Sequence, residues 1–175
     1  MKKREIRWIL CFFLCLAPFS AEGAGILYWG EGPADIRTEY GMIPASLSLG
    51  KVSFYRLSVP KGVLSLFAGF EADRLTVLVT MGPSGTKSHV ERIFAETAAG
   101  RKRLWGGNPV SVRYGPYEGF QWDMGPSRIS LVPVENPGTG VWQILEIREV
   151  SADLRDSWPV SGPVSKGTGS AALFL

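Results

Sequence analysis

The stretch YEGFQWDMGPSRISLVPV, residues 117–134, sets the pattern of the fold. Apolar residues occupy alternate positions in both of its halves: Phe120, Trp122 and Met124 in the first, Ile129 and Leu131 in the second. Successive side chains on a strand point to opposite faces of the sheet, so each set shares one face. Gly125-Pro126 lies between the two halves and turns the chain. The stretch therefore predicts a hairpin whose aromatic residues lie in the core.

The same stretch holds two acids, Glu118 and Asp123, which raises the question of an active site. A glycosidase needs two carboxyl groups that converge across one substrate within about 5–10 Å. Positions 118 and 123 have opposite parity, so on a regular strand they face opposite sides of the sheet. The pattern favours a structural role, with Trp122 in the core and Asp123 in solvent.

Further segments with strand patterns surround the hairpin: KVSFYRLSVP (51–60), VLSLFAGF (63–70), RLTVLVTM (74–81), PVSVRY (109–114) and GVWQILEIREV (140–150). In the third segment one core face is predicted to carry Leu75, Val77, Val79 and Met81. The last segment begins apolar on both faces and ends with the alternation Glu146, Ile147, Arg148. This predicts a central strand that emerges into solvent.

One helix is predicted within GPSGTKSHVERIFAETAAGRKR, residues 82–103. Apolar residues recur at helical spacing on one side only: Val90, Ile93, Phe94 and Ala98. Ser88 followed by Glu91 is a capping-box pattern, and Gly100 is placed to end the helix. We expect this helix to lie on a sheet with its other side in water.

The order of these elements, β-β-β-α-β-β-β-β, predicts an α+β fold. It has a largely antiparallel sheet of about six to eight strands with one helix packed on a face. The alternative is a β-sandwich in which the helix is peripheral.

The two ends of the chain have their own compositions. Residues 1–23 combine a basic start with an apolar run of twelve residues, Trp8 to Phe19, and small residues at Ala21 and Gly23. This is typical of a cleaved export signal, with cleavage after Gly23 or Ala24, and predicts no membrane span in the mature chain. Residues 24–150 would then form one domain, in which 24–51 show no sustained period beyond a short strand at ILYW. Residues 151–175 contain ten Ser, Gly or Pro and are predicted to be disordered.

Cleavage would change the charge and the cysteine content. The signal takes four of the 19 basic and two of the 16 acidic residues, which leaves 15 − 14 = +1. A nucleic-acid binder is expected to carry a larger basic surplus. Both cysteines leave with the signal, so the mature chain has no disulfide and no thiol.

The sequence predicts no catalytic residue, no metal site and no cofactor. His89 is the only histidine and falls in the first turn of the predicted helix, where a polar residue needs no special reason. The segment GPSGTKS, residues 82–88, resembles a phosphate-binding loop but is one residue short and has Thr86 where the motif needs glycine. It is interpreted as a helix-entry turn.

The best candidate binding site is GRKRLWGG, residues 100–107. Arg101, Lys102 and Arg103 precede Trp105, which together could form a platform for an anionic or sugar-like ligand. A solvated helix end followed by a core tryptophan explains the same residues.

A tyrosine- and phenylalanine-rich hairpin, one helix, and then an aromatic-W-x-x-G-x-x-x-I-x-L hairpin resemble small exported bacterial proteins of unknown function. Here the pattern is carried by Phe120, Trp122, Gly125, Ile129 and Leu131. The resemblance implies an α+β fold and a location in the cell envelope, either periplasmic or extracellular, but no activity.

These observations predict an exported, non-enzymatic binding or structural module of the cell envelope. Its partner would be a protein or a small ligand, and its oligomeric state is open. The alternative is a carbohydrate-binding or hydrolytic protein, favoured by five tryptophans in the mature chain. A coplanar row of exposed aromatics beside a carboxylate-lined groove would favour the alternative, whereas aromatics buried under the helix would favour the binding module.

Overall fold

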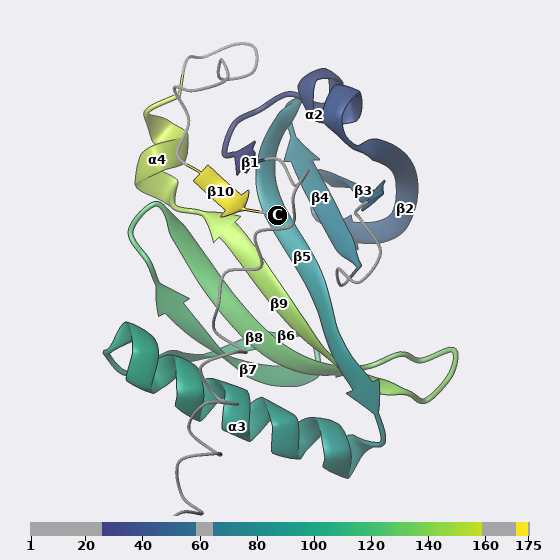
Figure 1. Ribbon diagram of the computed structural model, residues 1–175, viewed down its shortest axis with the longest axis vertical. Coiled ribbons are helices and arrows are strands. Elements are labelled where there is room, and N and C mark those ends of the chain that lie inside the picture. Colours follow the sequence, from purple (N-terminus) through teal and green to yellow (C-terminus); the bar gives the residue numbers. More distant parts are fainter. Residues whose placement is uncertain (1–25, 59–64, 159–170, 175) are drawn as a thin grey trace, which may run out of the picture.

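The computed structural model describes residues 26–58, 65–158 and 171–174. Its main element is one open antiparallel sheet (Figure 1). The eight strands lie in the order β2 (Gly41–Leu49), β3 (Val52–Ser58), β4 (Leu66–Glu71), β5 (Arg74–Gly85), β9 (Trp142–Val150), β8 (Ser127–Glu135), β7 (Tyr117–Asp123) and β6 (Val110–Tyr114). The predicted export signal, residues 1–23, lies outside the described residues.

The described residues also form three helices and a second, two-stranded sheet. The helices are α2 (Pro33–Glu39), α3 (Lys87–Trp105) and α4 (Ala152–Asp156). The small sheet pairs β1 (Ile26–Tyr28) with β10 (Ala171–Phe174) in antiparallel orientation. The predicted α+β fold is confirmed, since α3 packs on one continuous antiparallel sheet rather than beside a sandwich of two. The central position predicted for β9 is also confirmed.

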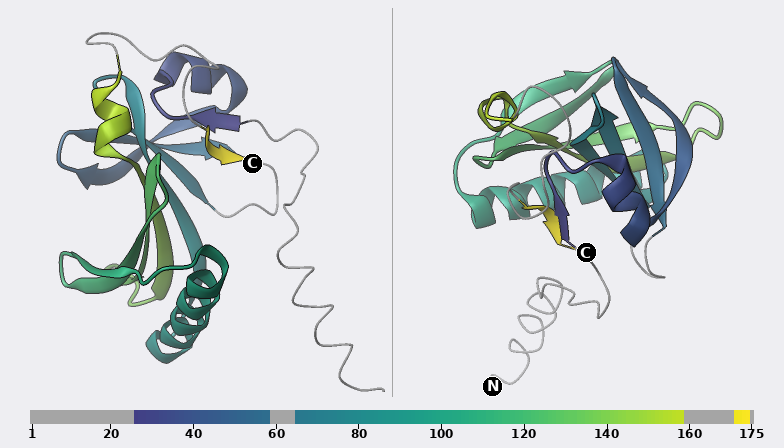
Figure 2. Two further views of the ribbon diagram at one scale, coloured as in Figure 1. Left: turned by 90° about the vertical axis from the view of Figure 1, so that its left-hand side faces the viewer. Right: turned by 90° about the horizontal axis from the view of Figure 1, so that it is seen from above.

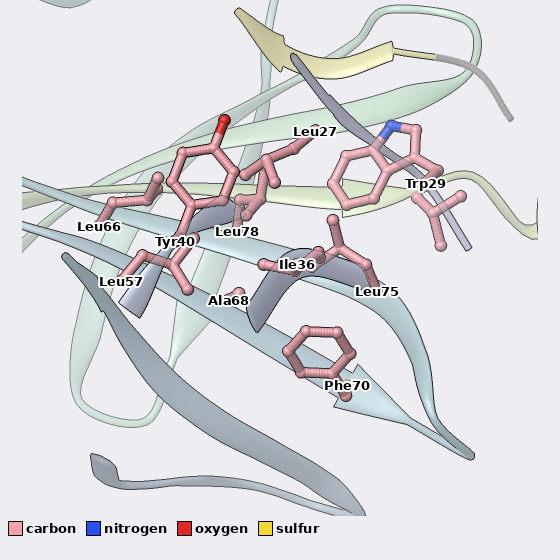
Figure 3. Packing of buried hydrophobic residues seen from close by; sticks show 11 residues of the cluster. Leu27, Trp29, Ile36, Tyr40, Leu57, Leu66, Ala68, Phe70, Leu75 and Leu78 are labelled. Carbon is pink, nitrogen blue, oxygen red and sulfur yellow. The ribbon is translucent and has the colours of Figure 1, made fainter. Parts of the chain in front are cut away.

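One face of the large sheet, here called the helix face, carries two separate clusters of buried residues. The α2 cluster consists of Leu27, Trp29, Ile36, Tyr40, Leu57, Leu66, Ala68, Phe70, Leu75, Leu78 and Val150 (Figure 3). The α3 cluster consists of Val90, Ala98, Trp122, Leu131 and Ile144, with Phe120, Trp105 and other half-buried residues around it. Figure 2 shows α3 and the β1–β10 pair on the same side of the sheet.

The opposite face, here called the tyrosine face, carries a third cluster. It consists of Phe54, Val77, Val79, Val132 and Ile147, against which Tyr114, Tyr117 and other apolar residues pack. The three described helices contribute no residue to this cluster. The sheet is therefore apolar on both faces, although all of its described helices pack on one.

The prediction that β5 has a single core face is wrong. Its residues Leu75 to Val79 are all buried, because β5 lies in the middle of the sheet. The register with β4 shifts between Gly69 and Phe70, which leaves Thr76 as an extra residue. A bulge of this kind reverses the parity of the strand. Leu75 therefore joins Leu78 in the α2 cluster, whereas Val77 joins the cluster on the other face.

The predicted ends of the helix are also corrected. The N-cap residue of α3 is Thr86 rather than Ser88, and the capping-box side-chain bond is not formed. The helix continues through Gly100 to Trp105 and ends at Gly106, whose φ of +68° suits glycine. The segment that resembles a phosphate-binding loop is not a loop, because β5 extends to Gly85 and Thr86 alone joins it to α3.

Regular structure also appears towards both ends of the described chain, where the sequence predicts only a short strand at ILYW. Residues 26–49 form β1, α2 and β2. Within the segment predicted to be disordered, α4 and β10 are regular, which corrects that prediction for these residues. Leu154 and Trp158 pack against the α2 cluster, and Ser151 caps α4 by accepting a bond from the Leu154 N–H. Residues 159–170 and 175 lie outside the described residues.

Candidate functional site

On the helix face of β9, charged side chains lie between the α3 cluster and the α2 cluster. Alternate residues along this strand share one face. Ile144 belongs to the α3 cluster and Val150 to the α2 cluster. The two positions between them on that face are Glu146 and Arg148. A charged pair therefore occupies the seam between the clusters, near the middle of the sheet.

Arg101 of α3 completes this cluster, which we call the arginine seam. Its Nη2 donates to Glu146 Oε2, and Arg148 Nε donates to Glu146 Oε1 at 2.7 Å. The two arginines thus hold the two oxygens of one carboxylate. All three side chains are largely but not fully buried, with 20% of Arg101, 16% of Glu146 and 28% of Arg148 exposed.

The electrostatics of the seam favour an anion. Burial alone would raise the pKa of Glu146, but the neighbouring Arg101 and Arg148 outweigh it and hold that pKa below its usual range. The carboxylate is therefore ionised at neutral pH, and two guanidinium groups share its single charge. Arg101 Nη1 is buried and has no hydrogen-bond acceptor among the described residues. The three side chains together carry a net charge of about +1 in a partly desolvated place, where charges interact more strongly than in water.

The four residues of the predicted binding platform have different surroundings. Arg101 enters the seam and lies over the Trp105 ring, with Cζ 4.9 Å from the ring centroid. Trp105 is half-buried and meets Trp122 edge to face at 5.6 Å. Lys102 and Arg103 are exposed and make no ion pair with any described residue. The structure therefore brings Arg101 and Trp105 together and leaves the two other cations on the surface.

Two residues of the seam, Glu146 and Arg148, were not predicted as site residues. Their alternation with Ile147 suggested a strand end in solvent, but both are partly buried. The sequence did hold a usable signal, because both residues have the parity of the apolar Ile144 and Val150. A charged pair between apolar residues of equal parity on a central strand indicates a buried ion pair.

A second polar group lies on the tyrosine face. Tyr114 and Gln121 both donate to the fully buried hydroxyl of Ser130, each at 3.0 Å. Burial raises the pKa of Tyr114 above its usual value, against the lowering effect of its bond to Ser130. Ser130 thus satisfies two polar side chains beside the apolar cluster. Because these side chains bond to one another, the arrangement is explained by its structural role without a ligand.

The aromatic residues at the hairpin do not form an exposed platform. One pair of rings is parallel, with Phe94 of α3 stacked on Phe120 at 5.5 Å and 2°, but both residues are half-buried between the helix and the sheet. Trp122 is 4% exposed and lies under α3 with Trp105, and their rings are at 81° to each other. Trp142, which packs against the α3 cluster, meets Tyr117 of the tyrosine-face cluster at 90°. Trp122 is therefore a core residue, as predicted.

Neither hairpin acid nor the single histidine forms a site with other acids or histidines. Glu118 is exposed and pairs with Arg113, and exposed Asp123 accepts from the Gly125 N–H. His89 is exposed in the first turn of α3 beside Arg92. In the part of the chain that the structure describes, no three His, Cys, Asp or Glu side chains are grouped as metal ligands. No helix among the described residues is both long and apolar enough to cross a membrane.

The resemblance to small exported bacterial proteins rests on packing positions. Trp122 faces Ile129 and Phe120 faces Leu131 across the β7–β8 hairpin, while Gly125 has the positive φ that its turn requires. These contacts explain why the pattern specifies a hairpin, and they carry no chemistry. No protein-family model, curated protein or solved structure matches this chain.

Proposed function

We propose that this protein is an exported, non-enzymatic binding module of the cell envelope that recognises an anionic group. The observation that supports the binding proposal is the arginine seam, where two guanidinium groups share one carboxylate. The ligand would be a small anion or an acidic group of a partner molecule.

The chemistry of the seam favours carboxylate or phosphate groups. Guanidinium groups present several N–H donors in a fixed plane, which matches the oxygens of these anions. Glu146 occupies only part of the donor capacity of Arg101 and Arg148. Because 20% and 28% of these side chains are exposed, the seam borders solvent, although the unpartnered Arg101 Nη1 itself is buried. Exposed Lys102, next to Arg101 on α3, adds to the attraction at low ionic strength.

The non-enzymatic part of the proposal is supported by where the aromatic residues lie. The aromatic group around Trp122 is packed under α3 instead of lining a surface beside acids, and a second aromatic group belongs to the α2 cluster. The exposed acids Glu118 and Asp123 interact with Arg113 and with the turn. These positions favour the binding module over a carbohydrate-binding or hydrolytic protein.

Anion binding is tested by titrating the full chain with inorganic phosphate and with succinate at low salt, using calorimetry. Arg148→Gln should weaken binding by roughly tenfold or more, since a hydrogen bond to a charged group contributes about 1.5–3 kcal/mol. Arg92→Gln is the matched control, because it removes one positive charge from an exposed position on α3. Equal binding by both variants would place the anion elsewhere, and no binding by the wild type would refute the proposal.

Export is tested separately, by the intact mass of the protein recovered from the cells that make it. The basic start and the short apolar run predict a chain that begins after Gly23 or Ala24. Recovery of a chain that still begins at Met1 in the cytoplasm would contradict export. That result would leave the anion site untouched.

A further inference from the structure

The two edges of the large sheet differ in how well they are protected from strand pairing. Natural edge strands commonly carry proline, bulges or inward-pointing charges that prevent pairing with another chain. At one edge, β2 contains Pro44, and its register with β3 shifts between Pro44 and Ser48. At the other edge, β6 pairs with β7 in an unbroken register and contains no proline. Of the two edges of the large sheet, β6 is the better suited to accept a further strand.

The hairpin geometry shows which backbone groups of β6 point outward. Tyr114 pairs with Tyr117 across a two-residue loop in which Gly115 has a φ of +59°. Such a loop is closed by a residue pair whose backbone groups bond to each other. Hydrogen bonding alternates along an antiparallel strand, so Ser111 and Arg113 direct their N–H and C=O groups away from β7. These two residues offer four backbone groups to an added strand.

We propose that two copies of this chain associate through β6, as antiparallel strands related by a twofold axis at Val112. In this register the outward groups of Ser111 bond to those of Arg113 in the second copy. Val110, which is 59% exposed, then lies opposite Tyr114 of the second copy. Pairs of an aromatic and a β-branched residue stabilise neighbouring strands. The two large sheets join into one.

The other two registers that keep outward groups opposite each other are less favourable. Centring the axis on Arg113 places two arginines directly opposite each other, which is destabilising. Centring it on Ser111 places Arg113 opposite Pro109, which has no N–H to donate. The axis at Val112 avoids both defects, so β6 is self-complementary in one register.

The association should be weak and concentration-dependent. A strand of five residues is about 17 Å long, and its pairing buries less than the roughly 1,200 Å² of a standard stable interface. The small net charge, +3 for the whole chain, opposes it little. The proposal goes beyond the anion site, because none of the seam residues lies on β6.

A disulfide trap tests the register. The chain has two cysteines, Cys11 and Cys15, and changing both to serine leaves an introduced thiol as the only one. Across the axis two copies of residue 112 form a non-hydrogen-bonded pair about 4.5 Å apart, within disulfide reach. Val112→Cys should therefore form disulfide-linked dimers under mild oxidation.

Val110→Cys is the matched control, on the same face of the same strand. Two copies of residue 110 lie about 14 Å apart in this register, too far for a disulfide. Val110 is exposed and Val112 is half-buried. Random collisions between chains would therefore give more disulfide-linked dimer from Val110→Cys than from Val112→Cys. We expect at least about fivefold more dimer from Val112→Cys, since disulfide geometry tolerates little displacement.

Sedimentation equilibrium of the full chain gives an independent measurement. The average mass of the wild type should rise with concentration, and Ser111→Pro, which removes an outward N–H, should abolish the rise while circular dichroism shows a folded chain. Equal cross-linking of the two cysteine variants would overturn the proposal. A wild type that stays monomeric up to millimolar concentration would overturn it as well, whichever anion the seam binds.

Discussion

Trp122→Ala should lower the free energy of unfolding by about 3–5 kcal/mol, the usual cost of truncating a buried aromatic residue. Trp122 is 4% exposed and contacts two further aromatic rings, Trp105 at 5.6 Å and Phe120 at 6.3 Å. Its loss would open a cavity where α3 meets the sheet. A domain is held together by about 5–15 kcal/mol, so the variant would lose a large part of its stability. Urea unfolding of both chains measures the difference.

Two further variants test whether the loss of stability in Trp122→Ala comes from the lost aromatic packing. Trp122→Phe should cost much less than Trp122→Ala, because it keeps an aromatic ring and removes an indole N–H that has no acceptor among the described residues. Asp123→Asn, at an exposed neighbouring position, keeps an oxygen for the Gly125 N–H and should change stability by no more than about 0.5 kcal/mol. If Trp122→Ala unfolded at the wild-type urea concentration, the α3 cluster would not stabilise the fold.

The β7–β8 hairpin could be predicted because its information is local. Alternation placed Phe120 and Trp122 on one face, and Gly125 supplied the turn, without reference to the rest of the chain. The same reasoning failed for β2. Its apolar residues Ile43, Ala45, Leu47 and Leu49 do alternate with polar residues or proline, but Pro44 lies within the run, and proline inside a run argues against a strand unless the strand is at an edge, as β2 is. It also failed for β10, which pairs with β1 from the other end of the chain.

Tertiary contacts explain the other differences. Gly100 is a local stop signal and costs a helix about 1 kcal/mol. The helix continues past it because Arg101 bonds to Glu146 and Trp105 packs on Trp122. These contacts depend on where α3 lies on the sheet, which periodicity does not give. For the same reason the sequence identified Arg101 but missed its partners.

Glu146→Gln should be the most damaging change in the arginine seam. It leaves two partly buried guanidinium groups without a counter-charge, and removing one partner of a buried ion pair costs about 3–5 kcal/mol. Glu118→Gln is the matched control, because Glu118 also pairs with an arginine but both side chains are about 70% exposed. An exposed pair contributes about 0–1 kcal/mol. Urea unfolding at neutral pH gives the comparison.

Arg148→Gln tests whether excess positive charge causes the loss of stability expected for Glu146→Gln. It leaves one arginine for one carboxylate, so it should destabilise the fold less than Glu146→Gln does. Equal losses of unfolding free energy in the two variants would show that the hydrogen bonds of the seam stabilise the fold and that its net charge has no effect. In that case the seam would be a structural link between α3 and β9, and the basis for anion binding there would be removed.

The pH dependence gives a second measurement of the Glu146 contribution. Burial raises the pKa of Glu146, but Arg101 and Arg148 lower it by more than burial raises it. The pKa in the folded chain therefore lies below the 4.5 of an unperturbed glutamate. Below about pH 5 the unfolded chain therefore binds more protons at this residue than the folded chain does, and stability falls as the pH falls. The wild type should lose this contribution as the pH drops through 4.5 and below. Glu146→Gln, which cannot titrate, should show a shallower decline over the same range, and the gap between the two chains should narrow. Parallel curves would mean that the seam does not hold the Glu146 carboxylate in its charged form.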